Sequence, residues 1–322
     1  MQAIVLSKSG SSSNLKIQQV PDPIPRSKEV LIKHKAIGIN FLDICFRRAQ
    51  YPLDEFPAIL GLEGCGYIEK IGSEVVDYKV GDRVAYATAG FGSYAEKRTV
   101  DQNLLIKVPN ELSDTVVAGT LFKGLMAHAL LNRVFIAVRA KRILIHSVAG
   151  GVGHIMCQLA KYYGLEIFGT VGSDDKIPLA TSFGCKHVIN YKKNNFVEEI
   201  AKLTNNQGVG IVYDGVGKDN VNKSMKCLWQ MGVCVSYGES AGKIEKFDCD
   251  LMIANSLYFT RPLMTMYKAH RAELALSADE VFASLIKGIV RPQIKEYEFK
   301  DIVKAHNDLE NRTSVGSLVL KL

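Results

Sequence analysis

The pattern of hydrophobic and polar residues changes near residue 120. Before that point, short segments in which hydrophobic and polar residues alternate are separated by Pro and Gly, as at 29–39, 66–72 and 82–90. Alternation with a period of two is typical of half-buried β-strands, and Pro and Gly end such strands early. The first part of the chain is therefore expected to form a small, mostly β domain.

Beyond residue 120, apolar strand-like segments alternate with helix-like segments. The six strand-like segments are 142–148, 165–171, 187–191, 210–217, 233–240 and 257–262. This alternation predicts a doubly wound parallel sheet, so the fold class is α/β with an additional, mostly β domain. Toward the C-terminus, 277–289 predicts a helix and 316–322 a strand, and we expect this tail to rejoin the first domain.

Three glycines follow the first strand of the expected parallel sheet. Gly150, Gly151 and Gly153 let the backbone turn sharply and leave its N–H groups open to a diphosphate at the start of the next helix. That helix has an apolar face made of Val152, Ile155, Met156, Leu159 and Ala160. A tight turn without a ligand is the alternative, but the strand before it, the helix after it and the further strand–helix units favour a dinucleotide site.

The end of the second strand decides between NAD and NADP. An acidic side chain there would bind the ribose 2′-hydroxyl of NAD, whereas this strand ends in Gly172 and Ser173, with Lys176 shortly after. Asp174 and Asp175 fall where a new helix begins, a place where acids cap the helix and stabilise its dipole. A hydroxyl and an ammonium suit a 2′-phosphate, so NADPH is the expected cofactor.

Composition narrows the class of protein without naming an activity. A chain of 322 residues exceeds one typical hydrophobic core and predicts about two domains. The net charge of +7 comes from scattered Lys and Arg, which favours a solvated basic surface over a nucleic-acid footprint. The seven cysteines include no C-x-x-C pair and are expected to be reduced core residues. With no leader pattern and no long apolar run, we expect a cytoplasmic protein without a membrane span.

Nine segments along the chain carry a resemblance to a known family. They are KAIGINFLD (35–43), GLEGCGYIEKIG (61–72), GDRVAY (81–86), FKGLMAHALL (122–131), AGGVGHIMCQLAK (149–161), GTVGSDDK (169–176), VINY (188–191), VYDGVG (212–217) and LYFTRP (257–262). Together they resemble the zinc-independent quinone oxidoreductases, the zeta-crystallin-like branch of the medium-chain dehydrogenase/reductase superfamily.

The resemblance implies a domain division and a cofactor site. Residues 1–121 and 264–322 would form a GroES-like catalytic domain, and 122–263 a Rossmann domain, with NADPH held in the cleft where the two meet. The residues implied to bind the cofactor are Asn40, Gly150, Gly151, Val152, Gly172, Ser173, Lys176, Tyr191, Val216, Tyr237, Gly238, Ser240, Arg261 and Arg312.

These residues divide by the part of NADPH that they would contact. Gly151 and Val152 would lie on the diphosphate. The 2′-phosphate would be held by Ser173, Lys176, Tyr191 and Arg312, and the nicotinamide half would be lined by Gly238, Ser240 and Arg261. Taken alone, either arginine is also compatible with a surface ion pair.

The same resemblance implies that no metal takes part. Zinc-dependent relatives carry Cys at the position of Asn40 and a His-Glu pair at the position of Leu62 and Glu63, and the segment 91–105 lacks the cysteines of their structural zinc loop. Catalytic zinc polarises a simple carbonyl, so an enzyme without it needs an acceptor that is already electron-poor. Quinones and conjugated enones meet that requirement.

The expected activity is NADPH-dependent reduction of a quinone. Asn40 would donate a hydrogen bond to developing negative charge on oxygen or fix the nicotinamide ribose, and Tyr51 would stack on the acceptor or donate through its hydroxyl. For Tyr51, a half-buried loop aromatic without a role is the alternative. Transfer as hydride or as single electrons is left open by the sequence.

Two other functions remain open at this stage. The nearer one is an NADPH-dependent reductase of activated alkenes, because conjugation carries charge to oxygen without a metal. The other is an RNA-binding or structural protein, which a scattered positive charge supports poorly. Relatives pair through the last strand of the parallel sheet, here within 256–262, to give a dimer or a tetramer, and a homodimer is the expected assembly.

Overall fold

A computed structural model describes residues 1–218 and 220–322, which form two compact units. The first unit contains residues 1–125, 268–288 and 292–322, and the second contains 126–267 with 289–291. Both chain ends thus belong to the first unit. The sequence places the corresponding divisions after residues 121 and 263.

The first unit is built mainly from β-strands. Its strands are β1 (Gln2–Leu6), β2 (Leu15–Gln19), β3 (Glu29–Ile39), β4 (Ala58–Ile59), β5 (Glu63–Ile71), β6 (Arg83–Tyr86), β7 (Lys97–Asp101), β8 (Ile106–Lys107), β15 (Ile294–Glu298) and β16 (Ser317–Lys321). The larger sheet has the order β15-β16-β3-β5-β6-β8, with β7 also paired to β3, and the smaller sheet has the order β2-β1-β4. The helices of this unit are α1 (Phe41–Arg47), most of α2 (Asp114–Ala129), α9 (Arg271–Ile286) and α10 (Ile302–Glu310).

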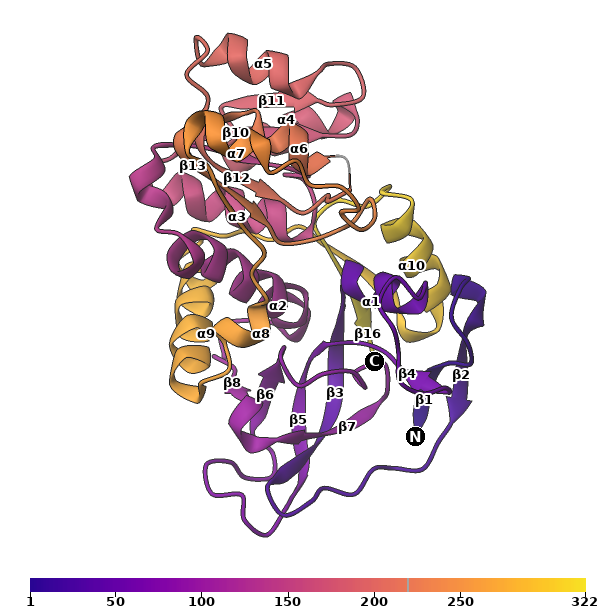
Figure 1. Cartoon of the computed structure of the whole chain (residues 1–322). Coiled ribbons are helices and arrows are strands. Elements are labelled where there is room, and N and C mark those ends of the chain that lie inside the picture. The colour runs from indigo at the N-terminus through magenta and orange to yellow at the C-terminus, as the bar shows by residue number, and fades with distance from the viewer. Residues whose placement is uncertain (219) are drawn as a thin grey trace. The chain divides into compact units, whose positions relative to one another are not determined.

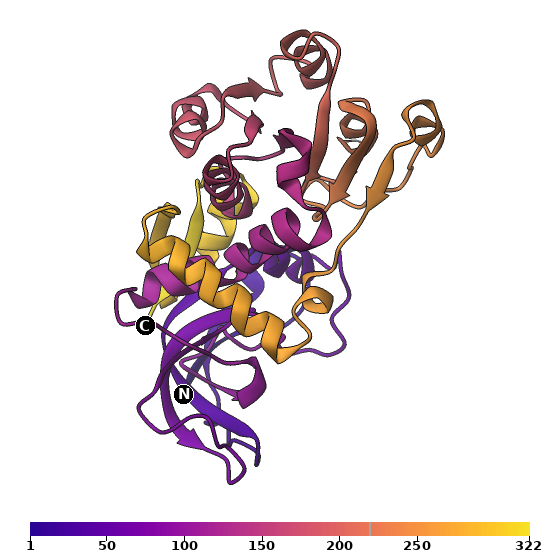
Figure 2. The ribbon, with the colours of Figure 1, turned by 90° about the vertical axis from the view of Figure 1, so that its left-hand side faces the viewer.

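The C-terminal strand returns to the first unit, as the sequence predicts. β16 pairs antiparallel with β3, so that Leu318 lies opposite Ile39 (Figure 1). The helix predicted at 277–289 is α9, which begins at Arg271. It lies beside α2 (Figures 1 and 2). Gly124 of α2 leaves room for Val281 of α9, because a Cβ on Gly124 would lie 2.6 Å from Val281 Cγ1.

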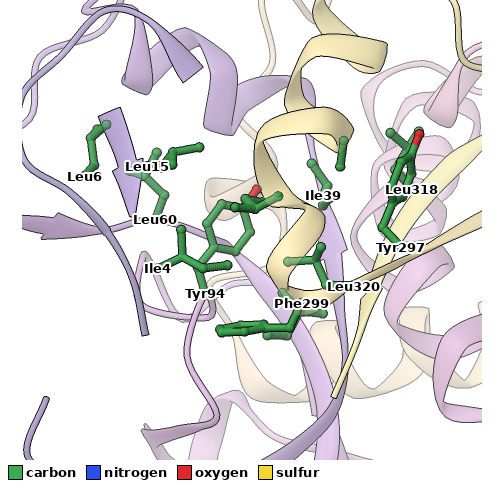
Figure 3. Close-up of a cluster of buried hydrophobic side chains, with 13 residues drawn as sticks. Ile4, Leu6, Leu15, Ile39, Leu60, Tyr94, Tyr297, Phe299, Leu318 and Leu320 are labelled. Carbon is green, nitrogen blue, oxygen red and sulfur yellow. The ribbon is translucent and has the colours of Figure 1, made fainter. Parts of the chain in front are cut away.

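One hydrophobic cluster joins the two ends of the chain within this unit. Side chains from β1, β3, β16 and α10 meet in it, together with Tyr94 and Phe299 (Figure 3). The centre of the cluster is enclosed, since Ile4, Tyr94 and Leu318 have no exposed surface. Burial of this apolar surface fixes α10 and the strands against one another.

The second unit is a doubly wound α/β layer structure, as predicted. Its strands are β9 (Arg142–Ile145), β10 (Glu166–Val171), β11 (His187–Asn190), β12 (Val209–Asp214), β13 (Leu228–Ser236) and β14 (Tyr258–Thr260). They pair in parallel in the order β11-β10-β9-β12-β13-β14, the strand order of a dinucleotide-binding sheet. The helices are α3 (Gly151–Tyr162), α4 (Ile177–Phe183), α5 (Phe196–Leu203), α6 (Asn220–Met225), α7 (Asp250–Asn255) and α8 (Met264–Tyr267).

The strands of the second unit carry mostly apolar side chains, because helices cover the sheet. β12 is buried along its whole length, and the apolar face predicted for α3 buries Ile155, Met156, Leu159 and Ala160, with Val152 partly exposed. A strand covered on both faces reads as a continuous apolar run, which explains the sequence of β12. Six of the seven cysteines are buried as predicted, but Cys249 is exposed, so the expectation was wrong for that residue. No helix among the described residues is both long and apolar enough to span a membrane.

Candidate cofactor and acceptor site

The glycine turn between β9 and α3 is shaped by close contacts of the backbone with itself. Ser147 adopts a left-handed conformation with φ of 55°, and its carbonyl oxygen accepts the N–H of Gly150 at 2.8 Å. A Cβ on Gly153 would lie 2.4 Å from that same oxygen and 2.9 Å from Val148 Cα. Only glycine at position 153 allows the helix to start this close to the strand.

No side chain caps the start of α3. Its N-cap is Gly150, which has no side chain to accept the first N–H groups of the helix, and α3 begins at Gly151. Unpaired N–H groups and the helix dipole favour negative charge at this end. A helix start without a side-chain cap, in a parallel sheet of this strand order, fits a dinucleotide diphosphate, which Gly151 and Val152 are predicted to hold.

The end of β10 gathers three of the residues predicted to bind a 2′-phosphate. Ser173 follows directly on Gly172, and a Cβ on Gly172 would lie 2.9 Å from the hydroxyl of Tyr191, which follows β11. Gly172 therefore lets Tyr191 come close to the strand end. Lys176 lies in the single helical turn that comes next, Asp174–Lys176.

Asp174 and Asp175 lie in the first turn of this short helix, as the sequence interpretation expects, but neither is its N-cap. Ser173, and not Asp174, occupies the N-cap position of the short turn. The carboxylate of Asp174 accepts from Asn190 Nδ2 at 2.6 Å and from Lys193 Nζ. The hydrogen bond from Asn190 lowers the pKa of Asp174 most, and that from Lys193 lowers it further. The carboxylate of Asp174 is therefore charged but already paired.

Asp214 holds the loop that carries Val216. One carboxylate oxygen accepts the N–H groups of Val216 at 2.8 Å and Gly217 at 3.1 Å, while the other accepts from Asn220 Nδ2 at 2.9 Å and Ser224 Oγ at 2.7 Å. Asp214 is fully buried at the end of β12. Four donors on one buried carboxylate leave this loop little freedom.

The loops after β12 and β13 are joined by main-chain hydrogen bonds. The N–H of Tyr237 donates to Asp214 O at 2.9 Å, and that of Ser240 to Gly215 O at 3.1 Å. A Cβ on Gly215 would lie 2.9 Å from the Tyr237 ring, and one on Gly238 would lie 3.0 Å from the Gly215 carbonyl oxygen. The predicted residues Val216, Tyr237, Gly238 and Ser240 therefore lie in one pair of adjoining loops.

Arg261 is held by a carboxylate that the sequence interpretation overlooked. Its Nη2 lies 2.8 Å from Glu239 Oε1, which also accepts the N–H of Ile244 at 3.2 Å. The side chain of Glu239 is 3% exposed and that of Arg261 is 47% exposed. A buried acid thus fixes an exposed base immediately after β14.

In the first unit, Asn40 joins β3 to α1 and is 4% exposed. Its backbone N–H donates to Asp43 Oδ2 at 2.8 Å, and its Nδ2 donates to Glu63 Oε1 at 2.9 Å. Lys123 Nζ lies 2.8 Å from the same Glu63 oxygen. Asn40 is therefore surrounded by buried charged side chains.

A buried hydrogen-bonded set lies beside Asn40. Tyr94 Oη donates to Asp43 Oδ2 at 2.9 Å and lies 3.0 Å from His306 Nε2. Burial raises the pKa of Asp43 to about 7 and lowers that of His306 to about 3. Near neutral pH the imidazole of His306 is therefore neutral, while the carboxyl group of Asp43 titrates.

Tyr51 and Arg312 occupy loop positions in the first unit. Tyr51 is partly buried and packs on Phe46 with a ring separation of 5.5 Å, which also fits the alternative of a loop aromatic without a role. Arg312 is exposed just after α10 in a left-handed conformation, φ 59°. The carboxylate of Glu310, at the end of α10, pairs with Arg47, the last residue of α1, and with Arg48, the C-cap of that helix.

Four histidines of the chain are buried rather than gathered at a metal site. His34, His128, His146 and His154 are all buried, and His34 is hydrogen-bonded to Tyr86 Oη at 2.7 Å. Within residues 1–218 and 220–322, no group of three or more His, Cys, Asp or Glu side chains is arranged to hold a metal ion.

Comparison with known proteins agrees with this arrangement. Residues 26–110 match the family described as alcohol dehydrogenase GroES-like domain, and residues 151–279 match the family described as zinc-binding dehydrogenase. Quinone oxidoreductase 1 of Escherichia coli is 35% identical over 317 residues, which covers 97% of each chain. This chain belongs to the zeta-crystallin-like quinone oxidoreductases of the medium-chain dehydrogenase/reductase superfamily.

Other relatives extend the comparison to cofactor and substrate. The crystal structure of the Escherichia coli quinone oxidoreductase complexed with NADPH matches with a TM-score of 0.96 and 34% identity over 100% of both chains. A 2-haloacrylate reductase of Burkholderia is 33% identical over 329 residues, covering 99% of this chain and 98% of the relative. This quinone oxidoreductase family member therefore has the predicted architecture, a Rossmann sheet with a GroES-like β domain.

Four charged residues near the predicted site were given no role in it from the sequence, and Glu63 was named only for its position in the zinc comparison. They are Glu63, Lys123, Asp214 and Glu239. Each lies inside a segment that carries the family resemblance or directly beside one of its predicted residues, but a sequence does not reveal that a charge is buried. Glu63 pairs with Lys123 and Glu239 with Arg261, contacts between distant parts of the chain that only the fold brings together, whereas the partners of Asp214 follow it within ten residues.

Proposed function

We propose that this chain is an NADPH:quinone oxidoreductase that works without zinc. The observation that carries the proposal is the full-length similarity to quinone oxidoreductase 1 of Escherichia coli. The strand end at Gly172, Ser173 and Lys176 supports NADPH over NADH, since it offers a hydroxyl and an ammonium where an NAD-dependent enzyme would carry an acid. Bound NADPH would supply the reducing equivalents.

The residues of the second unit would bind and orient the cofactor. The open N–H groups at the start of α3 would hold the diphosphate, and Tyr191 with Ser173 and Lys176 would bind the 2′-phosphate. The paired loops at Val216 and Tyr237 would support the nicotinamide half, because Asp214 fixes the first loop and main-chain hydrogen bonds fix the second to it.

In the first unit, Asn40 would act on the reacting groups. One of its amide hydrogens is taken by Glu63. The amide still has a second N–H, which would stabilise negative charge on the acceptor or fix the nicotinamide ribose. Asn40 and Leu62 stand where zinc-binding relatives carry metal ligands, and neither offers a typical zinc ligand, so the acceptor must itself be electron-poor.

A second candidate function is reduction of an activated alkene. It is favoured by the similarity to the 2-haloacrylate reductase of Burkholderia, which covers 99% of this chain. In such a substrate the conjugated carboxylate would accept negative charge during reduction. An RNA-binding or structural role has no comparable support; it would give an affinity that falls steeply with salt.

An acceptor panel separates the first two candidates. The purified chain would be supplied with NADPH and with 1,4-benzoquinone, 9,10-phenanthrenequinone, an enone or 2-chloroacrylate, and NADPH loss would be followed at 340 nm with product analysis. The proposal predicts the largest kcat/KM with a quinone. A larger kcat/KM with an alkene, and a saturated product, would assign the second function instead.

The proposal includes a homodimer formed through the edge of the parallel sheet. β14 is the last strand of that sheet, and Tyr258 on it is 60% exposed. An edge strand offers unpaired main-chain groups to a second copy. Light scattering of the purified protein should give about twice the mass of one chain, and a charge introduced at the exposed Tyr258 by Tyr258→Lys should reduce it to that of one chain.

A further inference from the structure

A buried group of charged and polar side chains surrounds Asn40. The carboxylate of Glu63 has no exposed surface and accepts three hydrogen bonds: from Asn40 Nδ2 at 2.9 Å, from Lys123 Nζ at 2.8 Å and from the N–H of Phe122 at 2.8 Å. The partners come from the end of β3 and from α2, so three separate segments meet at one carboxylate.

The surrounding backbone is shaped around this carboxylate. Gly38 lies opposite Glu63 in the ladder between β3 and β5. A Cβ on Gly38 would lie 2.2 Å from Glu63 Oε1 and 2.2 Å from the carbonyl oxygen of Ala118 in α2. The glycine therefore gives the carboxylate the space in which it meets Asn40 and Lys123.

The chemistry of the group fixes the amide of Asn40. A carboxylate accepts hydrogen bonds and does not donate them, so Asn40 must turn its NH₂, and not its carbonyl oxygen, toward Glu63. Rotating the amide by half a turn would bring two oxygen acceptors together in a buried place. Lys123 balances the charge of Glu63, and an unbalanced charge at such a place would be costly.

Stability alone is a weak reason for such a pair. A buried ion pair often contributes little, because desolvation of both ions offsets their attraction, and apolar side chains of similar size can replace it. What apolar residues cannot do is hold one particular orientation of a neighbouring amide. Asn40 is the polar side chain whose orientation Glu63 controls.

We propose that Glu63, held in place by Lys123, is a positioning residue that orients the Asn40 amide for the reduction step. This inference rests on the proposed function, in which Asn40 contacts the cofactor or the acceptor. Glu63 itself acts only through Asn40. Its removal therefore affects turnover when Asn40 is present, and has little further effect when Asn40 is already lost.

A double-mutant cycle tests this relationship. Glu63→Gln keeps the size of the side chain but presents an amide that pairs with either orientation of Asn40. We expect kcat with a quinone to fall about tenfold in Glu63→Gln, and to change less than twofold when the same substitution is made in Asn40→Ala. A purely structural role would cost the same factor in both backgrounds and would overturn the inference.

Two further variants separate positioning from loss of stability. Glu63→Gln leaves Lys123 buried without its counter-ion, so Glu63→Gln with Lys123→Met tests the same point in a neutral pocket, and kcat should again fall about tenfold. The matched control is Glu273→Gln, which breaks the pair between Glu273 and the buried Lys268 elsewhere in the unit, 3.2 Å apart. That variant should lower the thermal stability and leave kcat unchanged. An equal loss of kcat in Glu273→Gln would overturn the inference.

The failure of the inference is distinguishable from failure of the proposed function. If the unsubstituted protein oxidises NADPH with a quinone and the double-mutant cycle shows no coupling between Glu63 and Asn40, the function stands and the positioning role is wrong. If no acceptor is reduced, the function is wrong, and the same cycle is then measured on the NADPH dissociation constant by nucleotide fluorescence. Coupling between Glu63 and Asn40 greater than threefold in that constant supports positioning, and additive effects overturn it.

Discussion

The carboxylate of Glu239 lies 2.8 Å from the guanidinium Nη2 of Arg261, with the acid buried and the base exposed. Glu239 lies in the loop after β13, which main-chain hydrogen bonds join to the loop after β12. A single buried carboxylate therefore connects the arginine that follows β14 to the pair of loops predicted to hold the nicotinamide half of the cofactor. Arg261 is oriented by this contact, unlike an ordinary surface arginine.

Glu239→Gln should therefore alter binding equally for the two nicotinamide cofactors. The nicotinamide half is common to NADPH and NADH, so loss of the Arg261 orientation should weaken both by about threefold to tenfold, as expected for one charge-assisted hydrogen bond. Dissociation constants from fluorescence titration check this. A change confined to NADPH would place Arg261 at the 2′-phosphate and contradict the assignment.

Lys176→Met and Arg312→Met should change cofactor choice instead. Both residues are predicted to bind the 2′-phosphate, so each substitution should raise the dissociation constant of NADPH about tenfold to 100-fold and leave that of NADH almost unchanged. Lys202→Met is the control, because it removes the same charge from an exposed lysine of α5. Equal weakening of both cofactors by Lys176→Met would remove it from the phosphate site.

Gly153→Ala should disturb the turn that carries the diphosphate site. The new Cβ would meet the carbonyl oxygen of Ser147 at 2.4 Å, and backbone must shift to relieve that contact. We expect a loss of about 1–3 kcal/mol in the free energy of unfolding, the range for forced backbone shifts, and about tenfold weaker NADPH binding. Gly81→Ala is the control: its φ of 91° is unfavourable for alanine, but the new Cβ meets no atom. It should lower stability without changing NADPH affinity.

Asp43→Asn should change how stability depends on pH. Burial raises the pKa of Asp43 to about 7, from 3.8 for an ordinary Asp, so between these values the folded chain holds a proton that the unfolded chain has lost. This group therefore makes the free energy of unfolding fall as pH rises from about 4 to about 7, by up to about 1.4 kcal/mol per pH unit.

Two buried histidines have the opposite effect on the free energy of unfolding, which they make rise with pH up to about pH 6.5. Burial lowers the pKa of His306 to about 3 and that of His34 to about 4, so both contribute stability above pH 6.5 that is lost as pH falls toward those values. The informative quantity is therefore the difference between the natural sequence and Asp43→Asn in denaturant unfolding at several pH values. That difference should decline from pH 4 to pH 7 and then stay level; a constant difference would contradict the raised pKa.

The sequence predicted the fold because its patterns are local. A strand followed by Gly150, Gly151 and Gly153 and a helix is recognisable within some twenty residues, and the repeated alternation of strands and helices predicted the parallel sheet. The strand at 316–322 was predicted for the same reason, whereas its pairing with β3 is known only from the structure.

The charged residues around the site were missed because their meaning depends on distant contacts. Glu63 and Lys123 lie 60 positions apart and Glu239 and Arg261 lie 22 apart, and the sequence does not show that the fold pairs them and buries one member or both. The hydrogen bonds of Asp174 were missed for the same reason, since its partner Asn190 ends the next strand and its partner Lys193 follows that strand.

The central claim is that this chain binds a phosphorylated nicotinamide cofactor and uses it to reduce an electron-poor acceptor. The most direct measurement is the absorbance at 340 nm after the purified chain is mixed with NADPH or NADH and 9,10-phenanthrenequinone. We predict oxidation that depends on both protein and quinone, with kcat/KM for NADPH at least about tenfold above that for NADH, the value of one favourable charged contact. No protein-dependent oxidation of NADPH, or an equal or greater kcat/KM for NADH, would contradict the claim.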